Sequence, residues 1–102
     1  MFLLDVNVLI ALCDESHEFC SDARKWFVRH RASGWATCPL TENGMVRIMN
    51  HSAYGNGTTT PDIARSLLQI LMQDPHHVFI PDDISICDVN HFSDLNTITS
   101  KI

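Results

Sequence analysis

The sequence predicts an α/β domain built on a short parallel sheet. Short apolar runs begin at residues 2, 35 and 78, and helical patterns fill the stretches between them. Strands that alternate with helices are joined by crossover connections, which give parallel pairing. The length of 102 residues suits one domain, residues 1–102, and is too short for two.

The first part of the chain predicts two strands separated by two helices. Residues 2–4 suit a short buried strand, and the apolar run that follows favours a buried helix over 7–13. Apolar residues then recur at helical spacing over 18–32, where Ser33-Gly34 is a stop signal. Residues 35–38 predict the second strand, which is closed by a proline.

Two further helices are predicted in the middle of the chain. Thr41 can cap the first of them, with Glu42 in its first turn, where the helix dipole favours a negative charge. Thr60 can cap the second, with Pro61 at the first helical position and an apolar stripe up to Gln73.

The last part of the chain predicts one more strand and a less regular tail. We expect His76 and His77, which follow the last of these helices, to interact with its final carbonyls or with solvent. Residues 78–80 predict the third strand. Residues 84–102 show little periodicity and leave room for one short helix.

Charge restricts the ways in which this chain could bind a nucleic acid. The net charge of -5 and the pI of about 5.5 give no general attraction to RNA or DNA. Contact with RNA would need metal ions or a local basic patch. Arg24, Lys25, Arg29 and Arg31 could form one, although a solvated helix face is favoured as the explanation for these four residues.

The cellular location is predicted from features that the sequence lacks. We find no secretory leader, no apolar run long enough to cross a membrane, and no Cys-x-x-Cys pair among the four cysteines. We therefore expect a cytoplasmic protein with reduced cysteines and no membrane association.

Acidic residues follow each of the three predicted strands. Asp5 ends the first, Glu42 lies shortly after the second, and Asp82 and Asp83 follow the third. The carboxyl ends of parallel strands share one edge of the sheet, where carboxylates could bind Mg²⁺ or Mn²⁺. Such an ion can activate water and offset charge on a phosphodiester. Each acid can also be explained as a helix cap or dipole partner, and for Asp82 and Asp83 that explanation is favoured.

Three stretches of the sequence resemble a known family: LLDVNVL at 3–9, WATCPLTENG at 35–44 and FIPDDIS at 79–85. Together they resemble PIN domains and, more narrowly, the VapC-type toxins of prokaryotic toxin–antitoxin systems. The resemblance implies a three-layer α/β/α fold and a Mg²⁺- or Mn²⁺-dependent endoribonuclease that cleaves RNA. It also implies a homodimer that is silenced by a cognate antitoxin protein.

The resemblance assigns roles to particular residues. Asp5 matches the first metal-binding catalytic acid and Glu42 the second. Asn7 matches the polar position that would orient the Asp5 carboxylate or a metal-bound water. Thr41, which precedes Glu42 in the TENG stretch, is a supporting residue.

The sequence departs from the family pattern at its C-terminal end. The family carries a third acid in a Thr-Asp-x-x-Leu-like stretch and often a fourth after the next strand, and no residue up to Ile102 matches them. The resemblance therefore predicts a missing C-terminal helix and strand, weak cation binding at best, and a homodimer or segment-exchanged oligomer. The alternative function is an inactive PIN fragment that serves as a dimerising or antitoxin-binding module. An α/β protein unrelated to nucleases is disfavoured.

Overall fold

The computed structural model describes residues 1–51, 54 and 59–81, together with the backbone of 96–98. Its elements are β1 (Phe2–Leu4), α1 (Val6–Cys13), α2 (Cys20–His30), the 3-10 turn η1 (Arg31–Ser33), β2 (Trp35–Thr37), α3 (Pro39–Met49), α4 (Pro61–Leu71), β3 (His77–Phe79) and β4 (Asn96–Ile98). Strands alternate with helices as the sequence predicts.

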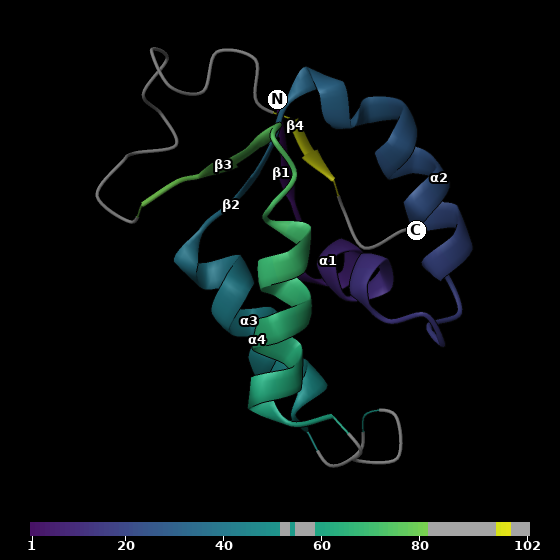
Figure 1. The fold of residues 1–102 in the computed structure, drawn as a ribbon, viewed down its shortest axis with the longest axis vertical. Coiled ribbons are helices and arrows are strands. Elements are labelled where there is room, and N and C mark those ends of the chain that lie inside the picture. The colour runs from purple at the N-terminus through teal and green to yellow at the C-terminus, as the bar shows by residue number, and fades with distance from the viewer. Residues whose placement is uncertain (52–53, 55–58, 82–95, 99–102) are drawn as a thin grey trace.

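The four strands form one parallel sheet in the order β3-β2-β1-β4 (Figure 1). The predicted α/β class with a short parallel sheet is therefore confirmed. β1 lies inside the sheet, between β2 and β4. The chain moves outward from β1 to β3 and then returns to the other side of β1, so β1 borders the topological switch point, where open α/β sheets bind ligands.

The tail contains a strand that the sequence did not reveal. Residues 84–102 had left room for a helix, whereas Asn96–Ile98 pair in parallel with Phe2–Leu4. A strand of three residues is too short to show a periodicity of its own. Its hydrogen bonds come from β1, which is a tertiary partner.

The start of α3 also differs from the prediction. Thr41 was expected to cap this helix, but Cys38 is the N-cap residue and Pro39 occupies the first helical position. Proline is suited to that position because its fixed φ is helical and its missing N–H would have no partner there. Thr41 is the third helical residue, where its Oγ1 accepts from the Cys38 N–H and donates to the Cys38 carbonyl, both at 3.0 Å.

The core forms where the helices pack on the sheet. In α1 every residue from Val8 to Leu12 is buried, as expected of a helix that is apolar on all sides. α2 packs on the sheet through two edge-to-face aromatic pairs, Phe27 with Trp35 and Trp26 with Phe2, with ring centroids 5.2 and 5.1 Å apart. Phe2 and Trp35 are neighbours in register on β1 and β2, so α2 covers that face of the sheet.

A glycine allows α3 to approach α1 closely. A Cβ placed on Gly44 would lie 2.9 Å from Cγ2 of Val6, which is closer than real carbon contacts allow. Val6 is the first residue of α1 and directly follows Asp5, while Gly44 lies two residues after Glu42. This contact therefore sets the distance between the chain segments that carry the two acids.

We expect Gly44→Ala to destabilise the protein by about 1–2 kcal/mol in urea unfolding, because the added methyl group would overpack against the stiff Val6 side chain. At an open helical position the same substitution would stabilise the helix by about 1 kcal/mol. The control is Asn43→Ala, at the exposed neighbouring position of the same helix. A Gly44→Ala variant as stable as the wild-type chain would contradict this account, whereas restored stability in a Val6→Ala, Gly44→Ala double variant would support it.

Candidate metal site at the carboxyl edge of the sheet

Asp5 lies between β1 and α1, at the N-cap position of α1. Its backbone carbonyl accepts from the N–H groups of Val8 and Leu9, both at 3.1 Å. Its side chain makes no capping hydrogen bond, and no ion pair or hydrogen bond joins it to any other residue that the structure describes. The half-buried carboxylate therefore remains available to a ligand, although helix capping would have been the ordinary explanation for it.

Glu42 lies in the first turn of α3 and is held by a hydroxyl group from the sheet. Thr37 Oγ1 donates to Glu42 Oε2 at 2.7 Å. Thr37 Oγ1 also lies 2.8 Å from Nε2 of His77, at the start of β3. Thr37 is 0% exposed, so these three side chains form a chain of hydrogen bonds whose centre is shielded from water.

His77 was misjudged from the sequence, because the structure places it in the sheet and not at a helix end. Its ring packs against Trp35, with centroids 4.6 Å apart. Burial lowers the pKa of His77, while the carboxylates of Glu42 and Asp74 act in the opposite direction. A neutral imidazole is therefore favoured beside Thr37.

Asp74 orders the turn that leads into β3. Its Oδ1 accepts from the backbone N–H of His76 at 2.8 Å, and its Oδ2 forms an ion pair with Nη1 of Arg31 at 2.6 Å. The backbone of the same turn joins the sheet, since Trp35 N–H donates to the His76 carbonyl at 3.1 Å. Burial alone would raise the pKa of Asp74, but the hydrogen bonds from His76 and Arg31, together with the Arg31 charge, lower it below its usual value.

The other predicted site residues are not drawn into this cluster. Asn7 is exposed in the first turn of α1 and its side chain makes no hydrogen bond within the described part of the chain, so its orienting role stays a prediction. Thr41 contacts the Cys38 backbone and supports the beginning of α3. Asp82 and Asp83 lie outside the described residues.

The donor atoms of Asp5 and Glu42 suit a hard divalent cation. Both offer carboxylate oxygen, and Oε1 of Glu42 has no hydrogen-bond partner among the residues described. The two acids follow neighbouring parallel strands at one edge of the sheet. Within residues 1–51, 54 and 59–81, however, no group of three or more His, Cys, Asp or Glu side chains could hold a metal ion. Water would have to supply the remaining positions, which Mg²⁺ tolerates.

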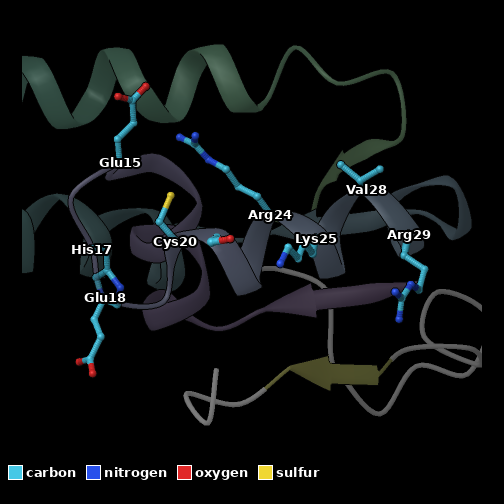
Figure 2. A pocket seen from close by; sticks show the side chains of 9 residues that line it. Glu15, His17, Glu18, Cys20, Arg24, Lys25, Val28 and Arg29 are labelled. Atoms are coloured by element: carbon cyan, nitrogen blue, oxygen red, sulfur yellow. The ribbon is translucent and has the colours of Figure 1, made fainter.

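A groove on the described surface lies away from the two acids. It has a volume of about 920 Å³ and runs along α2, and neither Asp5 nor Glu42 lines it. Figure 2 shows that Arg24, Lys25 and Arg29 reach it from the same helix. Arg24 donates to the Leu12 carbonyl at the end of α1, and Arg31 pairs with Asp74. Two of the four basic residues that we assigned to a solvated face therefore hold other elements in place.

The fold and the acids define a class: an α/β domain with carboxylates at the carboxyl edge of a parallel sheet. Known proteins narrow this class. Ribonuclease VapC39 of Mycobacterium tuberculosis is 43% identical over 84 residues, which is 82% of this chain and 60% of that protein. Ribonuclease VapC38 is 41% identical over 86% of this chain, and Ribonuclease VapC44 is 37% identical over 84%, both from the same species.

The chain is therefore similar to VapC-type ribonucleases over most of its own length, which confirms the resemblance predicted from the sequence. It spans about 60% of the length of the curated relatives that it matches. No family model matches the chain. None of the helices in the described residues is long and apolar enough to cross a membrane.

We expect Mn²⁺ to bind this site weakly, with a Kd in the millimolar range, because only two carboxylates are available to it. At a tenfold excess over Kd, binding would add about 1.4 kcal/mol to the free energy of unfolding, which raises Tm by about 5–10 °C in a chain of this size. Thermal scans of Asp5→Asn and Glu42→Gln should lose this shift, whereas Asp22→Asn, at an exposed acid of α2, should keep it. A submicromolar affinity would mean that further ligands exist.

We expect Asp74→Asn to cost about 1 kcal/mol at pH 7, since it removes the charge that pairs with Arg31. A carboxyl group whose pKa is lower in the folded state stabilises the protein above its unfolded pKa, near 3.8. That stability is lost as the pH falls through the folded pKa, so the variant should lose less stability than the wild-type chain on acidification below about pH 4.

The matched control for this prediction is Asp62→Asn. Asp62 is 91% exposed and pairs with Arg65 at 3.5 Å, so its removal should change stability little. Equal effects of the two substitutions in urea unfolding would contradict the structural role of Asp74.

Proposed function

We propose that this chain carries the metal-binding carboxylates of a Mg²⁺- or Mn²⁺-dependent endoribonuclease of the toxin–antitoxin type. The observation that supports this most strongly is its identity of 43% with a relative named as a ribonuclease, over a segment that includes most of the chain. The positions of Asp5 and Glu42 at one edge of the sheet agree with that activity.

In this proposal Asp5 and Glu42 bind the cation and act as the catalytic acids. The bound cation would supply charge stabilisation for the phosphodiester and an activated water. Glu42 would contribute a fixed oxygen, because Thr37 holds its other oxygen. Asp5 would contribute an oxygen at the N-terminus of α1, where Asn7 could orient it.

The partners are part of the same proposal. The substrate is RNA, and a cognate antitoxin protein silences the activity. A homodimer or segment-exchanged oligomer is supported by large apolar side chains that are exposed on several elements, among them Leu40 at 78%, Val28 at 73% and Ile70 at 65%. Exposed apolar surface of this kind favours association with another chain.

A second candidate function follows from the small number of ligands. In-line phosphodiester cleavage usually needs more preorganised charge than two carboxylates provide, and the described residues hold no third acid at this site. The alternative is therefore a catalytically inactive PIN module that dimerises or binds an antitoxin.

We expect the purified chain to cleave RNA in the presence of Mn²⁺, and Asp5→Asn to reduce the rate about 100-fold or more, because removal of the charge weakens cation binding at the reacting phosphate. Cleavage of a labelled RNA, followed on denaturing gels, measures this effect. Asp22→Asn controls for the loss of one acid elsewhere. Absence of cleavage at every Mn²⁺ concentration, with an intact fold, would exclude the enzyme and favour the inactive module.

A further inference from the structure

Thr37 is an unusual residue for the end of a buried strand. It is one of two polar side chains that are buried in the described part of the chain, and its exposure is 0%. Its hydroxyl oxygen lies 2.7 Å from Glu42 Oε2 and 2.8 Å from His77 Nε2. It therefore joins β2, α3 and β3 through side chains alone.

The single hydroxyl proton decides the direction of both hydrogen bonds. An ionised carboxylate can only accept, so the proton of Thr37 Oγ1 must point at Glu42. The same oxygen must then accept from His77, which requires a proton on Nε2 of the imidazole. His77 thus holds the Thr37 hydroxyl in the one orientation that donates to Glu42.

We propose that Thr37 and His77 are positioning residues, which orient Glu42 for a divalent cation at the carboxyl edge of the sheet. This inference rests on the metal site of the proposed function. The hydroxyl of Thr37 binds Oε2 of Glu42 and leaves Oε1 without a hydrogen-bond partner among the described residues. One carboxylate oxygen is thereby fixed by the sheet, and the other is presented to a ligand.

The two acids of the site differ in how they are held. Asp5 has no side-chain partner in the described structure, whereas Glu42 has a buried donor. A side chain of glutamate carries three rotatable bonds, so fixing it in advance lowers the entropy lost on cation binding. Partners that hold a metal-binding side chain in this way typically contribute a factor of 10 to 100 to metal affinity.

The test measures Mn²⁺ affinity directly, by the electron paramagnetic resonance signal of free Mn²⁺, and does not depend on RNA cleavage. Thr37→Val keeps the shape of the side chain but removes the hydroxyl, and it should weaken binding about 10-fold. Thr37→Ser should restore most of the affinity. The matched control is Thr59→Val, which makes the same change at a residue outside this cluster.

Variants of His77 test the other half of the chain of hydrogen bonds. His77→Leu removes the donor and should weaken Mn²⁺ binding, whereas His77→Gln can place an amide N–H where Nε2 lies and should bind within about twofold of the wild-type chain. Nitrogen-15 NMR at pH 8 should show the Nε2–H tautomer of His77 in the wild-type chain and in Asp5→Asn. Thr37→Val should lose that preference.

The outcomes separate this inference from the proposed function. Binding of Mn²⁺ that Thr37→Val weakens, without any RNA cleavage, would support the positioning role and exclude the enzyme. RNA cleavage together with unchanged Mn²⁺ affinity in Thr37→Val would overturn the positioning role and leave the enzyme in place. A change in unfolding free energy alone, or an Nδ1–H tautomer in the wild-type chain, would also overturn it. No Mn²⁺ binding by the wild-type chain would overturn both.

Discussion

The contact between Gly44 and Val6 determines how the carboxyl edge of the sheet is arranged. With any larger residue at position 44, a Cβ 2.9 Å from the Val6 side chain would push α3 away from α1. Asp5 directly precedes Val6, and Glu42 lies half a turn before Gly44, so the positions of both acids depend on this approach. A helical glycine usually weakens its helix. At position 44 the lost helix stability is offset by the close packing of α3 on α1, which any side chain at this position would prevent.

The two acids at this edge are held by different parts of the fold. Asp5 is placed by the backbone, since its carbonyl begins α1 while its side chain stays free of capping bonds. Glu42 is placed by its side chain, through the buried hydroxyl of Thr37 and, behind it, His77. The support of Glu42 therefore extends into the edge strand β3 and the Asp74 turn before it. Sequence distance hides this dependence, because His77 lies 35 residues beyond Glu42 in the chain.

Local patterns were enough to predict most of the fold, and tertiary contacts explain the rest. Apolar periodicity located the four helices, and the Thr60-Pro61 pair marks the beginning of α4, where Thr60 Oγ1 accepts from the Ile63 N–H at 3.2 Å. The strand at Asn96–Ile98 was missed because its partner is β1. Asp5 and Glu42 were predicted as site residues from their neighbours in the sequence. Thr37 and His77 were not, since only the pairing of β2 with β3 brings them together.

The ion pair between Arg31 and Asp74 joins positions 43 residues apart, and the segment between them contains β2, α3 and α4. Such a contact cannot form until both helices of the crossover are in place, because closing a long loop costs entropy before any contact repays it. All parallel strand pairs have this property, because the crossover connection between the two strands must be closed before they can pair. We therefore expect the Arg31–Asp74 pair to form late in folding. By contrast, the bond between Thr37 and Glu42 spans five residues, so the β2–α3 corner can form early and locally.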